Sequence, residues 1–467
     1  MRKMKNWHSL NLRLSSPFAA FFVLLALLAD AQNVTLQGVV LKSGTKEPVP
    51  YASIIYNTNK SAITNEEGRF IIVDSIGKIE NIIISCVGFK SITPDVHQLK
   101  ATEDLRFFLE ESLLVLPEVT ISGEEPDPTK LMAEVISLLE SNFMNKPYES
   151  TYFYRGTIRE NDKYTSLIES TGDWHSEGFS LSHYSEKDFA FLNFYEYFHP
   201  HHTRAALHHP WPQLENAKIA RMPFLFSFYR SFRYVIPTTT DLYDFALSKV
   251  YDEQSDLYVI EFKPKKIKDM QKQLEKLERN PGFSLSTGKY YIDFATMAIT
   301  QIDFVFVTQG ISFSGTIKFT KISDQYYKQY MRVNSVLNND KSSFNTTEEV
   351  FWSDFDAQEL AKNTIEKKYN IKLRDLKSPF RSLQVSNHSK KIRASYPNIH
   401  LSGLDWIVYL PMYEKNFWDK TITPPNPQEK KIKSDLLTFG PLEKQFETNK
   451  ISELYEKQKE RTAHGNR

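Results

Sequence analysis

The chain has almost no cysteine: Cys86 is the only one among 467 residues. A single thiol cannot form an intramolecular disulfide, so the fold must be stabilised by its hydrophobic cores. Cys86 follows closely on the apolar run Ile82–Ile84. These neighbours predict a buried, inert thiol rather than a nucleophile.

Net charge and long apolar runs are also lacking. The chain has 58 Lys and Arg residues against 57 Asp and Glu residues, without the strongly basic character that nucleic-acid binding requires. After residue 31, no stretch approaches the ~20 consecutive apolar residues of a membrane-spanning helix. The chain does have 41% hydrophobic residues, including 33 Phe and 24 Tyr. This content is enough for two or three folded domains.

Several catalytic motifs are missing. The sequence contains no Gly-x-Ser-x-Gly nucleophile elbow, no Gly-x-Gly-x-x-Gly loop and no Walker loop. Carboxylate pairs such as Asp173 and Glu177 could serve a glycosidase, but such pairs are inevitable among 57 acidic residues. The motifs therefore predict that the protein is not an enzyme.

The amino terminus has the pattern of a secretory signal peptide. Four basic side chains come first: Arg2, Lys3, Lys5 and Arg13. The apolar run Pro17–Leu28 follows, and Ala29–Ala31 supplies the small residues that a signal peptidase needs. We expect residues 1–31 to be removed and the protein to be exported; an uncleaved anchor is the alternative. No cysteine stands at the end of this leader, so we expect no lipid anchor on an amino-terminal cysteine.

Short β-like runs follow between Val34 and Phe108, at spacings of roughly ten residues. Turn residues separate them, namely Pro48–Pro50, Asn65–Gly68 and Gly88. This pattern indicates a small antiparallel sandwich. Its order and spacing resemble the carboxypeptidase regulatory-like domain, a transthyretin-like seven-stranded β-sandwich of many cell-envelope proteins. The resemblance implies an accessory module at residues 32–117, and it implies no chemistry.

The remaining chain predicts an α+β domain and a less regular tail. After a linker at residues 118–128, Asp127 and Pro128 are typical of a helix start. Apolar residues at helical spacing predict that this helix runs to about Asn142. Alternating patterns then predict strands at 151–159, 164–171 and 258–263 and a meander at 290–337. The fold class is therefore mainly β with α+β: the sandwich, a curved antiparallel sheet with flanking helices over 129–350, and a helical or irregular region over 351–467.

One hairpin carries a second resemblance. The segment from Gly288 to Ile302 resembles the hairpin of curved-sheet periplasmic lipoprotein-chaperone folds. It also resembles the uncharacterised region that follows the regulatory-like module in Bacteroidetes-type envelope proteins. The resemblance implies an envelope protein of that type.

The name of the first family raises the question of a zinc peptidase. Zinc carboxypeptidases use a His-x-x-Glu pair and a distant third histidine, which together leave one metal position open for water. His183 and Glu186 match the pair, but no histidine lies between His209 and His388. The regulatory-like module is therefore expected without its enzyme.

A histidine cluster is the sharper candidate for a metal site. Five histidines fall within eleven residues: His199, His201, His202, His208 and His209. Imidazole binds zinc, copper or nickel, so the cluster predicts a transition-metal site. The alternative is a solvent-facing loop between prolines, without a cofactor.

Two further segments have two interpretations each. The aromatic and basic tract Phe224–Tyr234 is either a buried part of the sheet core or a patch at a lipid interface. The charged segment Lys265–Arg279 is either a solvated helical arm or a surface for an acidic partner.

The leading hypothesis is a non-enzymatic exported cell-envelope protein, periplasmic or associated with the outer membrane. Its role would be binding or scaffolding, with a protein partner, a lipid or a glycan as ligand and no nucleic acid. An apolar tunnel would favour lipid, whereas a shallow groove of Tyr and Trp would favour glycan. A soluble partner of a TonB-dependent outer-membrane transport system is the alternative. A metal-binding protein or a carboxypeptidase-like hydrolase is the remaining possibility.

Overall fold

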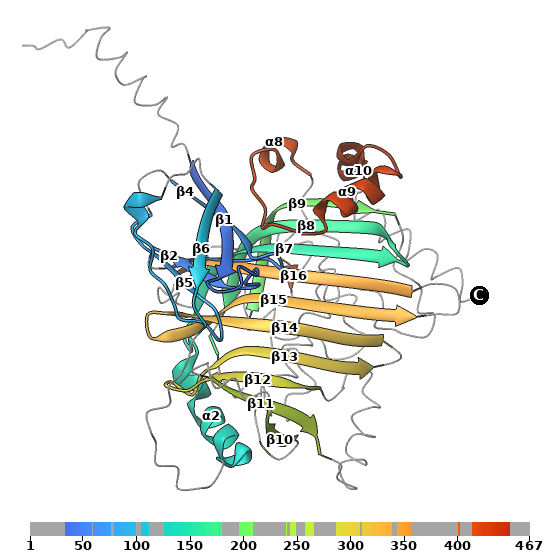
Figure 1. Ribbon diagram of the computed structural model, residues 1–467. Helices are drawn as coiled ribbons and strands as arrows, with labels where there is room; N and C mark the ends of the chain where they lie inside the picture. The colour runs from blue at the N-terminus through green and yellow to red at the C-terminus, as the bar shows by residue number, and fades with distance from the viewer. Residues whose placement is uncertain are drawn as a thin grey trace, which may run out of the picture.

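The computed structural model describes fifteen stretches of the chain (Figure 1). They are residues 33–57, 59–75, 79–99, 104–111, 126–176, 178–179, 196–208, 240, 243–248, 257–265, 286–308, 311–338, 343–356, 400–401 and 413–448. The expected signal peptide, residues 118–125 of the expected linker, and both His183 and Glu186 lie outside these stretches.

The N-terminal part is a sandwich of two three-stranded sheets. The first has the order β4–β1–β6, from Arg69–Ser75, Asn33–Lys42 and Asp104–Leu109. The second has the order β3–β2–β5, from Lys60–Ile63, Ser53–Tyr56 and Ile82–Ser85, and a short helix η1 (Val96–Gln98) follows. Alternate residues such as Ile54, Phe70 and Ile84 are buried between the sheets. The described residues of the sandwich contain six strands, whereas the resemblance implied seven.

An eleven-stranded antiparallel sheet forms the second part and confirms the expected curved sheet (Figure 1). Seven strands follow one another in sequence and in space: β10 (Tyr243–Leu247), β11 (Leu257–Pro264), β12 (Thr287–Asp293), β13 (Ile299–Thr308), β14 (Ile311–Ile322), β15 (Gln325–Asn338) and β16 (Ser343–Asp356). The last of them pairs with β7 (Tyr148–Glu160), and the sheet continues through β8 (Lys163–Ser176), β9 (Glu196–Leu207) and β17 (His400–Leu401). Strand β16 continues past Val350, because the alternation of buried residues holds to Trp352. Phe355 is buried again after a shift in register between Ser353 and Asp356.

The two faces of this sheet have different partners. The core face carries a large hydrophobic cluster that includes Tyr154, Ile302 and Val350. Helix α2 (Pro128–Asn142) contributes its buried stripe, Leu131, Met132, Val135 and Leu139, to the same cluster. Asp127 caps this helix by accepting from the backbone N–H groups of Thr129 and Lys130, as the sequence predicts.

The opposite face, here called the junction face, receives the sandwich and the C-terminal segment (Figure 1). Three helices form that segment: α8 (Lys415–Trp418), α9 (Glu429–Leu437) and α10 (Leu442–Thr448). Ile432 and Leu436 of α9 pack on Tyr164, Leu167 and Ala206 of the sheet. No helix among the described residues is both long and apolar enough to cross a membrane.

Candidate ligand groove at the domain junction

Strand β3 fixes the sandwich to the junction face by hydrogen bonds. The hydroxyl of Ser61 donates to the carbonyl oxygen of Trp352 at 3.0 Å, and the amide of Gln329 donates to that of Ala62 at 3.0 Å. The side chain of Asn59 donates to the carbonyl oxygen of Phe355 at 3.0 Å. Side chains of each domain therefore satisfy the hydrogen-bonding capacity of backbone carbonyls in the other, where water is excluded.

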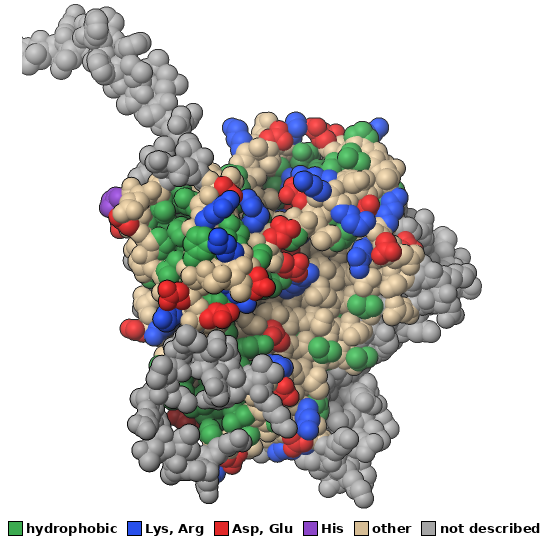
Figure 2. Space-filling view, in the orientation of Figure 1, with side chains coloured by type: hydrophobic (Ala, Val, Ile, Leu, Met, Phe, Trp, Pro, Cys, Tyr) green, Lys and Arg blue, Asp and Glu red, His purple; other side chains and the backbone are tan. Residues whose placement is uncertain are grey.

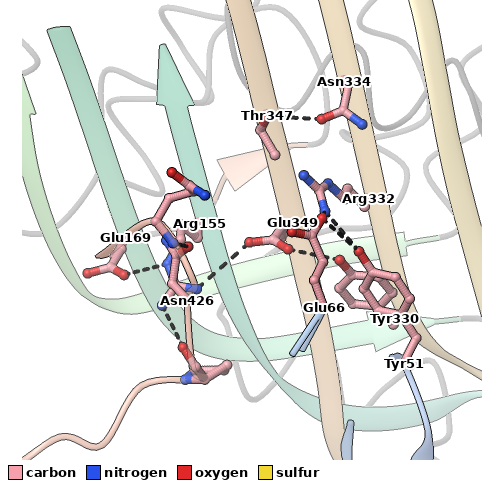
Figure 3. Close-up of polar contacts among 12 residues, drawn as sticks. Tyr51, Glu66, Arg155, Glu169, Tyr330, Arg332, Asn334, Thr347, Glu349 and Asn426 are labelled. Carbon is pink, nitrogen blue, oxygen red and sulfur yellow. Dashed lines mark hydrogen bonds and ion pairs between the residues drawn. The ribbon is translucent and has the colours of Figure 1, made fainter. Parts of the chain in front are cut away.

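A charged network reinforces the junction (Figure 3). The guanidinium of Arg155 donates to Glu169 and to the carbonyl oxygen of Pro424, at 2.8 Å each. A second group joins Arg332 to Glu66 and to the hydroxyl of Tyr51. The network thus connects the sheet, the sandwich and the C-terminal segment.

Burial and charge compete within this network. Arg155 and Glu169 are both almost fully buried, at 4% side-chain exposure each. Burial alone would raise the pKa of Glu169, but the guanidinium groups of Arg155 and Arg204 outweigh it and hold that pKa below its ordinary value. The cavity left among these groups is about 50 Å³. This volume suits ordered water rather than a ligand, so the network is a structural clamp.

A much larger groove opens beside the clamp. Its volume is about 800 Å³, and it lies between strands β2 and β5 of the sandwich and strands β12 to β15 of the sheet. At β3, where the two domains are in contact, Ser61 is only 4% exposed, whereas Ile83 of β5, which lines the groove, is 39% exposed. The hydroxyls of Ser53 and Thr320, 3.1 Å apart, join the two walls.

Uncharged polar side chains make up half of the lining residues. Nine side chains carry a hydroxyl: Tyr51, Ser53, Ser85, Ser91, Thr93, Thr300, Thr320, Ser323 and Tyr326. Three more carry an amide: Asn57, Asn81 and Gln329. Figure 2 shows the same side of the molecule, where the exposed sheet beside the sandwich is mostly tan, the colour of uncharged polar side chains and backbone. The groove is therefore suited to a ligand with many hydrogen-bonding groups.

Lys318 supplies a buried cation to this groove. Only 8% of the residue is exposed, and its ammonium donates to the carbonyl oxygen of Tyr51 at 2.8 Å. Burial lowers the pKa of Lys318, while Cys86 and Asp303 oppose this effect. The oxygens of Asp303 accept hydrogen bonds from Thr316 and Tyr291 instead. A buried titratable group in a cleft marks a candidate functional site.

Tyr51 belongs to both the clamp and the groove. Its φ of 56° lies in the left-handed region, which a bulky side chain rarely adopts. Its ring stacks on Tyr330 with centroids 5.3 Å apart, and its hydroxyl donates to Glu66. These contacts and the hydrogen bond from Lys318 together hold Tyr51 in its strained backbone conformation.

Cys86 differs from its prediction. The thiol is only partly buried, lines the groove and lies 3.8 Å from the carbonyl oxygen of Pro50. The apolar run before it does fill the sandwich core through Ile82 and Ile84. Cys86 lies just after the strand ends, where the chain turns toward the sheet.

The described histidines enter separate contacts. His201 lies 3.2 Å from Asp173, and His202 stacks on Phe417 with centroids 3.5 Å apart. His208 is 2.6 Å from the side-chain oxygen of Gln445 and stacks on Phe439. His199 pairs with Asp173 along β8 and β9 through its backbone, and His209 lies outside the described residues.

No three His, Cys, Asp or Glu side chains in the described part of the chain lie close enough together to hold a metal ion. The histidine cluster thus stays a prediction from the sequence. The tract Phe224–Tyr234 and all of Lys265–Arg279 except Lys265 lie outside the described residues.

Comparison with known proteins supports the sandwich. Residues 36–121 match the family model of the CarboxypepD_reg-like domain, which confirms the kind of domain expected from the sequence. A search of curated proteins gave no match.

Solved structures show distant likenesses that each cover 52% of this chain. A putative outer membrane lipoprotein-sorting protein domain from Vibrio parahaemolyticus is 12% identical, is covered over 97% of its length and has a TM-score of 0.23. A LolA superfamily protein from Nitrosomonas europaea is 9% identical, is covered over 100% and has a TM-score of 0.23. The MucA/MucB complex of Pseudomonas aeruginosa gives 9% identity, 96% coverage and a TM-score of 0.13. At these TM-scores we transfer neither fold nor function to this chain.

Proposed function

We propose that this chain is an exported, non-enzymatic protein of the cell envelope that binds a saccharide in the junction groove. The observation that carries the proposal is a groove of about 800 Å³, between two domains, in which half of the lining residues carry a hydroxyl or amide side chain. Ligand sites are commonly 300–1,000 Å³ and often lie at domain interfaces.

The lining favours a polyhydroxylated ligand over a lipid. A lipid chain requires an apolar lining, whereas half of the groove residues here carry a neutral hydrogen-bonding side chain. The aromatic rings of Tyr51, Phe89 and Phe319 and the side chain of Ile83 supply apolar surface for the faces of a sugar ring.

The clamp explains why the sandwich is needed for such a site. The β3–β2–β5 sheet of the sandwich forms one wall of the groove, and the ion pair of Arg332 with Glu66 holds the sandwich against the large sheet. The ion pair of Arg155 with Glu169 joins β7 to β8 within the large sheet. The sandwich would act as an accessory domain that shapes the site. Location in the periplasm or at the outer membrane is part of the proposal and rests on the signal-peptide pattern of residues 1–31.

A protein partner is the second candidate. Val305 on the junction face is 46% exposed and Phe294 is 58% exposed, which gives apolar contact points outside the groove. A TonB-dependent outer-membrane transporter is one such partner. Pull-down from outer membranes with the mature protein, with and without a Val305→Asp substitution, would detect it.

A saccharide panel tests the main proposal. Ile83→Trp places a larger side chain in the groove at a position where the native side chain is 39% exposed. Val305→Trp is the control, because Val305 is an exposed apolar residue of strand β13 in the large sheet and does not line the groove. We expect the wild type to bind at least one oligosaccharide and Ile83→Trp to weaken binding at least about tenfold. A wild type that binds no saccharide, or equal losses in both variants, would refute the proposal.

A further inference from the structure

Two polar groups in the groove have hydrogen-bonding capacity that the protein does not use. Lys318 has three N–H donors, and the described contacts use one of them, on Tyr51. Gln329 is 2% exposed and donates to Ala62, but its side-chain oxygen accepts no hydrogen bond. Both residues line the groove.

Lys318 also differs from the buried cations of the clamp. Arg155 is paired with Glu169, and Arg332 is paired with Glu66. Among the described residues, no carboxylate forms an ion pair with Lys318. The ammonium lies over the ring of Tyr51, 5.4 Å from its centroid. A buried charge without a counter-ion still costs free energy, and an anionic ligand group in the groove would offset that cost.

The charge of the groove favours an anion. Two lysines, Lys318 and Lys321, and one carboxylate, Asp293, belong to its lining. The carboxylate oxygen of Asp293 accepts from the backbone N–H and the hydroxyl of Thr296, so the turn after β12 already uses it. A ligand acid group would supply the missing counter-ion of Lys318.

We propose that the groove contains a subsite for an acidic saccharide, in which the ligand's carboxylate pairs with the ammonium of Lys318 and a neighbouring ligand hydroxyl donates to the side-chain oxygen of Gln329. This inference rests on the proposed saccharide function and narrows its substrate class to sugars that carry a carboxylate, such as uronic acids. The pairing satisfies a buried donor and a buried acceptor in one contact.

The test compares an acid with its own neutral ester. Oligogalacturonate and its methyl ester share the same rings and differ in charge, and a neutral galactose oligomer and a sulfated one complete the set. Binding to the mature wild-type protein is measured by calorimetry. We expect the acid to bind at least about tenfold more tightly than the ester, because an ion pair with a buried ammonium is lost on esterification. This comparison needs no variant.

Lys318→Met then assigns the effect to one residue. Met keeps the length of the side chain and removes the charge, and Lys321→Met is the control because Lys321 is an exposed lysine on the same strand and in the same groove. We expect Lys318→Met to lose the preference for the acid over the ester, and Lys321→Met to keep it. A thermal melt of each variant confirms that it is folded.

The outcomes separate the inference from the proposed function. Equal binding of acid, ester and neutral oligomer, with all three blocked by Ile83→Trp, would overturn the acid subsite and leave saccharide binding intact. Binding of the sulfated oligomer alone would overturn the carboxylate assignment. A preference for the acid that survives in Lys318→Met would overturn the role of Lys318. Absence of binding to every saccharide would overturn both proposals.

Discussion

The ammonium of Lys318 lies 2.8 Å from the carbonyl oxygen of Tyr51, across the junction between the large sheet and the sandwich. This bond joins a buried lysine without a carboxylate partner to a tyrosine with a φ of 56°. Each residue costs free energy of folding: Lys318 because its ammonium is buried, and Tyr51 because its backbone is strained. Their meeting in a groove of about 800 Å³ favours a binding role over a purely structural one.

Replacement of Lys318 tests whether it serves stability. In Lys318→Met the buried ammonium and one hydrogen bond are both removed, so we expect the free energy of unfolding at pH 7 to stay within about 1 kcal/mol of the wild type or to rise. Because burial lowers the folded-state pKa, the unfolded chain binds more protons as pH approaches 10.5. The free energy of unfolding of the wild type should therefore increase relative to that of the variant as pH rises toward 10.5. Urea unfolding from pH 7 to pH 10.5 measures this, and a loss of several kcal/mol at pH 7 would make Lys318 a structural residue.

Replacement of Glu169, unlike that of Lys318, should lower the free energy of unfolding. Glu169→Gln removes the carboxylate that pairs with both Arg155 and Arg204. It leaves Arg155 with the more distant Glu349, at 3.7 Å, so we expect a loss of about 3–5 kcal/mol at pH 7. The folded-state pKa of Glu169 is lowered, so its contribution is present above the ordinary value of 4.5 and is lost as pH falls through the folded pKa. The difference between wild type and variant should shrink on acidification.

The exposed pair of Arg69 and Asp104 is the control for that experiment. Its partners are 47% and 44% exposed, and Asp104→Asn should cost about 1 kcal/mol or less. Equal costs for Glu169→Gln and Asp104→Asn would show that the buried network does not act as a clamp.

Glu348 on the core face is a carboxyl that destabilises the fold. It is 1% exposed, neither of its oxygens accepts a hydrogen bond, and burial raises its pKa well above the ordinary value. The free-energy cost of burying Glu348 is therefore absent below pH 4.5 and grows as pH rises toward the folded-state pKa. We expect Glu348→Gln to stabilise the protein more at pH 8 than at pH 4.

The neighbouring residue gives the matched comparison for Glu348. Glu349 points to the junction face and accepts from the hydroxyl of Tyr330 at 2.8 Å. Glu349→Gln should therefore destabilise the protein, whereas Glu348→Gln should not. Denaturant midpoints of both variants at pH 4 and pH 8 measure these effects. Destabilisation by both substitutions at pH 8 would contradict the destabilising role of Glu348.

The histidine contacts predict a protein that does not need a transition metal. His202 and His208 stack on Phe417 and Phe439 of the C-terminal segment, so His208→Ala should loosen that segment. We expect faster hydrogen exchange in residues 429–448 of His208→Ala and no change on addition of a chelator. Elemental analysis of untagged protein should give less than about 0.1 equivalent of transition metal; a full equivalent would support the metal site predicted from the sequence.

The sequence was sufficient for the elements whose signals are local. Asp127 and Pro128 predicted the start of α2, and alternation predicted the strands that became β7, β8 and β11. The groove was missed because its signal is not local. In the run from Ile317 to Thr320, Lys318 has the pattern of an ordinary solvent-facing lysine on a half-buried strand. Its burial depends on Tyr51, 267 residues earlier in the chain, and on how the two domains dock.

The exposure of Cys86 was predicted wrongly for a related reason. Its apolar neighbours indicated a core position, but the strand ends at Ser85 and the next residues face the groove. The clamp of Arg155 and Glu169 also lacked a local signal, because these residues lie on adjacent strands and meet only when the sheet forms.

The most direct measurement is calorimetric titration of the mature wild-type protein and of Lys318→Met with oligogalacturonate and its methyl ester. The account predicts binding of the acid at least about tenfold tighter than the ester in the wild type, and equal, weak binding of both in Lys318→Met. Equal affinities for acid and ester in the wild type would contradict it.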